Sequence, residues 1–125
     1  MDWTITSTDP FGIVRIEISG LATVNECERL VNEVLALETW RAGCKLLIDC
    51  QRVNVKALRF TEVDRSAIIL RNRILEFGNC KIALIVTPGV GQGIGNQFKF
   101  MTESKTDIRV EAFLNEENAV LWLTD

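Results

Sequence analysis

Two stretches of sequence decide the fold: Lys-Leu-Leu-Ile-Asp-Cys at residues 45–50 and Lys-Ile-Ala-Leu-Ile-Val at residues 81–86. Each is a nearly unbroken apolar run of strand length. Runs of this kind are typical of central parallel strands, because helices cover such strands on both faces and no polar side is needed. We therefore expect the two segments to lie side by side, pointing the same way, in the middle of a sheet.

The segments outside this pair predict flanking strands. Residues 13–19 and 108–113 alternate between apolar and polar side chains, which indicates strands with one solvent-facing side, nearer the edges of the sheet. Residues 3–8 predict a short first strand, and the sequence Asp-Pro-Phe-Gly at residues 9–12 is a turn signal. We expect this first strand to pair antiparallel at the rim.

Four helices are predicted between and after these strands. Residues 23–38 and 61–77 each open with a hydroxyl side chain and an acidic one three positions later, the spacing of a capping box. A glycine-rich loop at residues 87–95 precedes a third helix that runs to about Ser104, and Asn115 caps the last one. The order β-β-α-β-α-β-α-β-α predicts one α/β domain with a mostly parallel five-stranded sheet.

Several short motifs match a known group in order and spacing along nearly the whole chain. They are Gly20-Leu21, Trp40-Arg41-Ala42-Gly43 before Leu47-Ile48-Asp49, Ala83-Leu84-Ile85-Val86, the glycine-rich turn before Phe98, and the closing Phe113, Glu117, Ala119, Trp122 and Leu123. In these motifs the chain resembles small bacterial STAS-domain proteins similar to the stage II sporulation protein AA. The resemblance implies a STAS-like β-α superhelix over residues 1–125, a fold shared with lipid-carrying CRAL-TRIO modules. It also implies a regulatory or protein-interaction module rather than an enzyme.

One motif of that family is missing. The family's anti-anti-sigma factors are phosphorylated on a serine in an Asp-Ser motif at the start of the second helix, whereas the matching stretch here, residues 60–64, has no Asp-Ser. We interpret Thr61 as an N-cap, since its hydroxyl can accept from a free backbone N–H. Phosphorylation of Thr61 or Ser66 is kept as an alternative hypothesis.

The composition argues against catalysis, metal binding and nucleic-acid binding. The 125 residues include no histidine, which removes the commonest general base, the commonest metal ligand and every Ser-His or Cys-His pair. We expect no enzyme, no metal and no cofactor. The net charge of −3, from 14 basic and 17 acidic residues, gives no indication of a nucleic-acid partner.

The cysteines and the hydropathy profile predict a cytoplasmic location. Four cysteines stand at positions 27, 44, 50 and 80, without a C-x-x-C pair and next to apolar residues, so we expect buried, reduced thiols. No apolar run reaches the roughly 18 residues needed to cross a bilayer, and the first residues lack the pattern of a signal peptide.

A first candidate site lies at the carboxyl edge of the sheet, where open parallel sheets bind ligands. Basic side chains of the 51–60 loop and glycines of the 87–95 loop are expected to converge there on an anion, a nucleotide or an acidic peptide. The glycines do not complete a Gly-x-Gly-x-x-Gly motif. The candidate residues are Arg52, Lys56, Arg59, Thr61, Gly89, Gly91 and Gly93.

A second candidate site is the helix predicted over residues 61–77. Beyond its inward stripe it carries Ile68, Ile69 and Leu75, a wider apolar band than one packing face requires. Burial in the plain core explains at least some of these residues. For the others, three explanations remain open: a cavity that holds a lipid or another small molecule, a homodimer contact, or a surface for a protein partner.

Overall fold

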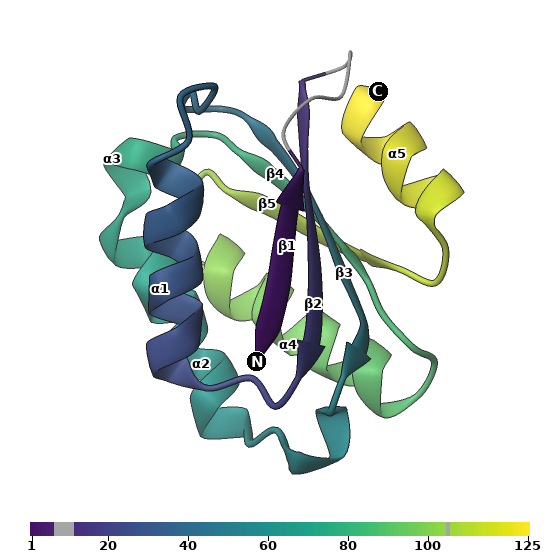
Figure 1. The fold of residues 1–125 in the computed structure, drawn as a ribbon. Helices are drawn as coiled ribbons and strands as arrows, with labels where there is room; N and C mark the ends of the chain where they lie inside the picture. The colour runs from purple at the N-terminus through teal and green to yellow at the C-terminus, as the bar shows by residue number, and fades with distance from the viewer. Residues whose placement is uncertain (7–11, 105) are drawn as a thin grey trace.

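Five strands form one sheet in the order β1-β2-β3-β4-β5 in the computed structural model, which describes residues 1–6, 12–104 and 106–125 (Figure 1). The strands are β1 Asp2–Thr6, β2 Ile13–Gly20, β3 Lys45–Val53, β4 Lys81–Ile85 and β5 Arg109–Phe113. β1 pairs antiparallel with β2, and the other neighbours pair in parallel. The predicted sheet is confirmed. Residues 7–11, which hold the end of the predicted first strand and most of the predicted turn, lie outside the described residues.

The two apolar segments lie next to each other at the centre of the sheet. β3 and β4 are in register, with Leu46 opposite Ile82 and Leu47 opposite Ala83. Because successive side chains of a strand point to opposite faces, Leu46 and Ile82 join one apolar core and Leu47 and Ala83 join the other. All four side chains are at most 3% exposed, so both faces of these strands are covered.

The helices cover the two faces unequally (Figure 1). One face carries α1 Val24–Leu35, α2 Phe60–Asn72, the short α3 Ile74–Phe77 and α4 Val90–Glu103. On the other face, α5 Glu116–Thr124 packs through Ala119 and Leu123. A 3-10 turn, η1 Val55–Ala57, leads from β3 to α2. In the described part of the chain, no helix has the length and hydropathy to span a membrane.

Two of the three predicted capping residues are confirmed. Thr23 at α1 and Asn115 at α5 each accept a hydrogen bond from the backbone N–H three residues later. α1 ends at Leu35, earlier than predicted. The prediction for Thr61 is wrong, because α2 begins one residue before it and Arg59 is the N-cap residue. Thr61 is an exposed residue of the first turn.

The predicted helix over residues 61–77 is interrupted. α2 ends at Asn72, and Arg73 has φ −111° and ψ 24° before α3 begins. The Arg73 guanidinium donates to Glu76 of α3 and to Asn32 of α1, at 2.6 Å in each case. These contacts between helices have no signature in the local sequence. Gly78, with φ 62°, ends α3 as predicted.

The prediction that residues 87–95 form a loop is also wrong, because α4 begins at Val90 and contains three of the four glycines. Two of these glycines let the helix approach the sheet. A Cβ atom on Gly95 would lie 3.2 Å from the Cβ of Ala112 and 3.3 Å from a methyl of Val86. A Cβ on Gly91 would lie 2.4 Å from the Thr87 hydroxyl. Close packing therefore outweighs the low helix propensity of glycine here.

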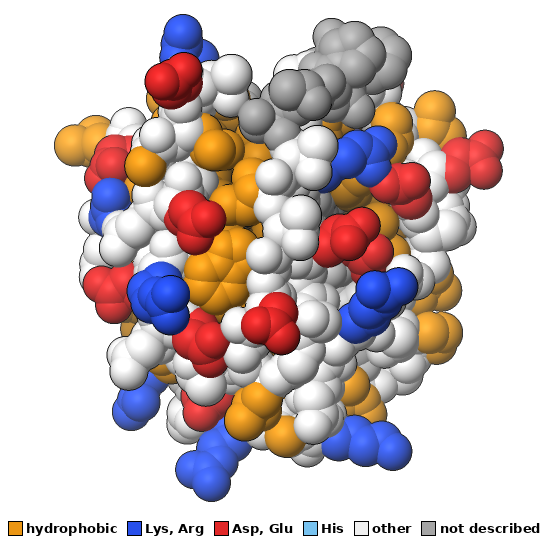
Figure 2. Space-filling view, viewed as in Figure 1, with side chains coloured by type: hydrophobic (Ala, Val, Ile, Leu, Met, Phe, Trp, Pro, Cys, Tyr) orange, Lys and Arg blue, Asp and Glu red, His pale blue; other side chains and the backbone are white. Residues whose placement is uncertain are grey.

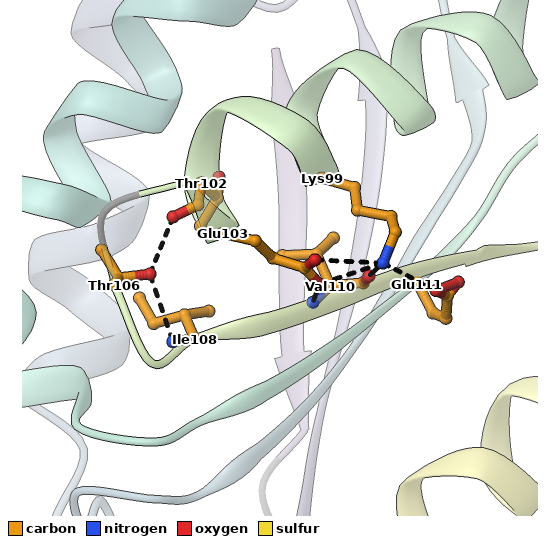
Figure 3. Close-up of polar contacts among 7 residues, drawn as sticks. All are labelled: Lys99, Thr102, Glu103, Thr106, Ile108, Val110 and Glu111. Atoms are coloured by element: carbon orange, nitrogen blue, oxygen red, sulfur yellow. Dashed lines mark hydrogen bonds and ion pairs between the residues drawn. The ribbon is translucent and has the colours of Figure 1, made fainter.

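Side chains of α4 cover the free edge of β5 (Figure 3). Val110 N–H donates to the Glu103 carboxylate at 2.7 Å, and the Val110 carbonyl accepts from Lys99 Nζ at 3.1 Å. Lys99 Nζ also forms ion pairs with Glu103 at 3.1 Å and with Glu111 at 2.8 Å. Thr106 Oγ1 accepts from Ile108 N–H. Backbone groups that would otherwise face solvent at this edge are thus paired within the chain.

Candidate functional site

An apolar cavity of about 190 Å³ lies between the sheet and the helices α1, α2 and α4. Alternate residues of the central strands form its floor, among them Leu46 and Ile82. Leu30 of α1, Leu70 of α2 and Phe98 of α4 line it from the helix layer. Each of these residues continues the inward stripe of its strand or helix, so the ordinary amphipathic pattern builds the wall of the cavity.

Small side chains at inward positions leave the cavity open. Cys27 of α1, Ser66 of α2 and Cys50 of β3 line it, together with Gly91 and Gly95 of α4. Larger apolar residues in place of Cys27, Ser66 or Cys50 would extend into the space. The two glycines act differently, because they border the cavity where α4 packs too closely for a Cβ atom. The cavity therefore follows from several small residues on different elements, which the fold brings to one place.

The cavity is suited to an apolar guest. None of the side chains that line it in the described part of the chain carries a charge. Its hydroxyl groups come from Ser66 and Thr87, and Ser66 Oγ already donates to the carbonyl of Glu62 at 2.9 Å. A guest with several polar groups would lose hydrogen bonds to water without finding partners there, which is costly.

The two thiols in the cavity wall are poor nucleophiles. Burial raises the pKa of the Cys50 thiol to about 12, and burial likewise raises the pKa of Cys27. Both thiols are therefore protonated at neutral pH, and the thiolate is the reactive form. Cys44 and Cys80 are also free thiols, and neither lines the cavity. Cys80 is buried, whereas Cys44 and both cavity thiols are partly exposed, so the prediction of buried, reduced thiols holds only in part.

The cavity approaches the surface at the carboxyl edge of the sheet. Along β3, Leu46 is 3% exposed, whereas Ile48 and Cys50 are half-buried. The wall continues through the partly exposed residues Val55 and Leu58, which belong to η1 and the segment after it. A guest would therefore enter beside η1.

Two of the predicted basic residues flank this end of the cavity. Lys56 lies between the wall residues Val55 and Leu58, and Arg59 follows Leu58 directly. Both basic side chains are exposed. At this lower end of the molecule, where α2 begins, apolar side chains appear beside basic ones on the surface (Figure 2).

The third predicted basic residue lies elsewhere. The register of β2 against β3 shifts between Glu17 and Ser19. Arg52, which is opposite Ser19, lines a polar groove with Glu17, Asp49 and Asp2. None of these four charged residues lines the apolar cavity. The structure therefore does not bring Arg52 together with Lys56 and Arg59.

The remaining candidates of the first site are spread over α2 and α4. Gly91 lines the cavity, Gly89 with φ 79° is the N-cap residue of α4, and Gly93 is exposed on that helix. Thr61 is exposed near the start of α2 and does not line the cavity, whereas Ser66 does. Phosphorylation of Thr61 or Ser66 stays a prediction.

The second candidate site is divided by the break after α2. Ile68 is 41% exposed, Ile69 is half-buried, and Leu75 on α3 is 93% exposed. None of the three lines the cavity. The predicted apolar band thus does not form the cavity wall, and an explanation by surface contacts stays a prediction.

Reasoning from the sequence did not identify the residues that open the cavity. Cys27, Cys50 and Ser66 each look like ordinary tolerated substitutions within an apolar stripe. The available signal is the repetition of small residues at inward positions on successive elements. This repetition can be recognised only when it is known which inward positions of different strands and helices lie opposite one another.

Comparison with known proteins shows which known fold this structure resembles. No protein-family model matches the sequence, and no curated protein matches it. Among solved structures, the chain is similar to an uncharacterized protein from the DUF3478 family with a SpoIIAA-like fold, from Shewanella loihica PV-4. The TM-score is 0.63 at 15% identity, and the match covers 98% of this chain and 92% of that chain.

This chain has a SpoIIAA-like fold. The likeness confirms the fold class and the resemblance at the level of architecture. At 15% identity it carries no information on activity, ligand or partner. What a SpoIIAA-like fold does in this chain has to be argued from its own residues, and the cavity is the feature that bears on it most directly.

Proposed function

We propose that this protein is a non-enzymatic carrier that binds a small apolar molecule between the sheet and α1, α2 and α4. The observation that supports this most strongly is the cavity of about 190 Å³, whose described lining side chains carry no charge. The N-terminal ammonium of Met1, which also lines the cavity, is paired with Glu26 at 2.9 Å. The absence of histidine from the sequence and the protonated state of the two wall thiols support binding rather than chemistry.

The size of the cavity sets the size of the ligand. An engineered protein cavity of roughly 150 Å³ with an apolar wall stays dry and binds benzene. Sites for drug-sized molecules are larger, roughly 300–1,000 Å³. A cavity of about 190 Å³ lies between these values, closer to the first. It therefore suits a single short alkyl chain or one substituted ring.

A series of straight-chain alcohols, from butanol to dodecanol, tests the proposal. Each methylene buried from water contributes roughly 0.8 kcal/mol, so the affinity should rise about fourfold per methylene until the cavity is full. Beyond that length the affinity should level off. Isothermal titration calorimetry measures the affinities, and the rise in melting temperature provides an independent readout.

Two matched substitutions on α1 show whether binding occurs in the cavity. Val31 lines the cavity, whereas Val24 on the same helix does not. Val31→Phe should fill the space and weaken alcohol binding at least tenfold, while Val24→Phe should leave the affinity unchanged. Equal affinities in both variants, or no binding by the unaltered protein, would contradict the proposal.

The cysteines report the position of the guest directly. Cys27 and Cys50 lie in the wall, and Cys44 and Cys80 do not. Saturating octanol should therefore slow the alkylation of Cys27 and Cys50 and leave the other two rates unchanged, as measured by peptide mass spectrometry. Equal protection of all four thiols would instead indicate a general stabilisation of the fold.

A protein-interaction module is the second candidate function, and two exposed aromatic residues favour it. Phe60 is 70% exposed and Phe100 is 72% exposed. Gln97 Nε2 donates to the Phe60 carbonyl, and Phe100 follows Gln97 by one helical turn, so both rings belong to the region where α2 meets α4. Exposed aromatic side chains are enriched in protein interfaces.

Sedimentation equilibrium tests the self-association form of this candidate. If the region contacts a second copy, Phe60→Ser with Phe100→Ser should shift the protein from dimer to monomer. Leu121→Ser, which removes an exposed apolar side chain on α5, is the control and should have no effect. A monomer at all concentrations would exclude a homodimer at this surface.

A further inference from the structure

We infer that the ligand is an anionic amphiphile, with its alkyl chain in the cavity and its acidic head group at the rim between Lys56 and Arg59. This inference rests on the proposed function and adds the ligand class. Its basis is that Lys56 and Arg59, which have no ion pair among the described residues, stand beside the wall residues Val55 and Leu58.

The segment from Val55 to Arg59 alternates between wall and solvent. Val55 and Leu58 line the cavity, while Lys56 and Arg59 are exposed immediately beside them. An alkyl chain against Val55 and Leu58 would thus bring its head group to the level of the two basic residues. This combination, an apolar wall followed by cations at its outer end, matches the two halves of an amphiphile.

The two cations are available to a ligand. Within the described residues, neither Lys56 nor Arg59 forms an ion pair or a side-chain hydrogen bond. Asp64, a nearby acid on α2, instead accepts from Gln97 Nε2 at 2.8 Å. Arg59 also presents a planar fork of donors that matches a carboxylate or a phosphate.

The start of α4 adds to the positive potential at this edge. η1 and α4 are in contact, and Gly91 in the first turn of α4 is part of the cavity wall. The first N–H groups of a helix have no partner within the helix and favour anions. The head group would therefore meet basic side chains from one element and backbone donors from another.

The polar groove on the opposite face does not compete for this role. Arg52 there is surrounded by Asp2, Glu17 and Asp49, so the local charge is negative. An anion is disfavoured at that groove and favoured at the rim that holds Lys56 and Arg59.

The experiment compares octanoate with octanamide, which has the same chain and nearly the same shape but no charge. We expect octanoate to bind about tenfold more tightly by calorimetry in low salt, with the advantage shrinking as salt is added. Octyl phosphate, as a third probe, shows whether a phosphate head group is preferred to a carboxylate.

Two double variants assign the effect to the rim. Lys56→Gln with Arg59→Gln should abolish the advantage of octanoate and leave octanamide binding unchanged. Arg41→Gln with Lys45→Gln makes the same change of residue types and charge at the other end of β3, and should preserve the advantage. Melting temperatures of all variants show that each one folds.

The outcomes separate this inference from the proposed function. If octanamide and octanoate bind equally, and the rim variant behaves like the control, the anionic head group is excluded while the apolar carrier stands. If the advantage is lost equally in both double variants, net charge rather than the rim explains it, and the inference is overturned. If neither probe binds, both proposals fail.

Discussion

On the α5 face of the sheet, Ile13, Leu47 and Leu123 are at most 2% exposed and pack against one another, whereas the face under α1, α2 and α4 encloses a cavity of about 190 Å³. Both faces are formed by the same alternating strands. The difference arises in the helix layer. One helix can settle onto the sheet wherever its side chains fit, but three helices side by side are also held apart by one another.

The contrast indicates which face of a small α/β domain has space for a ligand. Apolar patterning determines which residues turn inward on both faces, and it does not determine whether the space between them is filled. Small residues at facing positions leave space, and close-packed ones do not. Four experiments test this contrast between the two faces.

The largest effect is expected from truncating a side chain on the filled face. Leu123→Ala should reduce the free energy of unfolding by ~3 kcal/mol, because it removes a fully buried side chain and leaves a new void. Leu70→Ala on the cavity face should cost about 1 kcal/mol less, since part of the Leu70 surface already borders empty space. Urea denaturation measures both. Equal losses would contradict the contrast between the faces.

The next effect concerns the distance between α4 and the sheet. Gly95→Val should reduce the free energy of unfolding by about 2 kcal/mol, because its side chain would overlap Ala112 and Val86. Gly93 on the same helix has open space around it, so Gly93→Ala should increase stability by about 0.5–1 kcal/mol. Thermal denaturation shows whether the melting temperature falls in Gly95→Val and rises in Gly93→Ala. A Gly95→Val protein as stable as the parent would show that the close approach is not required.

A third effect depends on pH. Burial raises the pKa of Cys50 to about 12 from an ordinary value of 9.0. Between these two pH values the unfolded chain releases the thiol proton and the folded chain keeps it. The contribution of Cys50 to the free energy of unfolding is therefore fully present below pH 9 and is lost as the pH rises toward 12. The loss between pH 7 and pH 10 should be about 1 kcal/mol smaller in Cys50→Val. The same loss in both proteins would show that Cys50 is not the group responsible.

The smallest effect compares the starts of two helices. Asn115→Ala should cost about 1 kcal/mol, because the side chain accepts from the Asn118 N–H at the start of α5. Thr61→Ala, at the start of α2, should change the free energy of unfolding by less than about 0.5 kcal/mol. The reason is that Thr61 lies within α2 and is not its N-cap residue. Urea midpoints resolve the two. A large loss for Thr61→Ala would restore the capping role that the sequence predicted.

Most of the fold was predictable because its signals are local. The unbroken runs at residues 45–50 and 81–86 predicted the central strands, and the alternating segments predicted their neighbours. The errors occur where distant contacts outweigh local preference. Gly91 and Gly95 are helical because α4 packs closely at these two positions. The break at Arg73 coincides with side-chain contacts to Asn32 and Glu76.

The candidate site was predictable only in part. Lys56 and Arg59 were expected at the carboxyl edge and lie there, whereas an irregular pairing of β2 and β3 places Arg52 in a separate groove. A cavity was one of three explanations for Ile68, Ile69 and Leu75, yet none of these residues lines the cavity that the structure contains. No residue that does line the cavity indicates a cavity when its position in the sequence is considered alone.

The sequence alone predicted which strands are central, which lie nearer the edges, and the inward stripe of each helix, because hydrophobic periodicity acts within a single element. The existence of the cavity, and the place where it opens, can be seen only in the folded structure. A void is a property of several surfaces at once: it depends on how far α1, α2 and α4 stand from the sheet, and on small residues such as Cys27 and Cys50 lining the space between them.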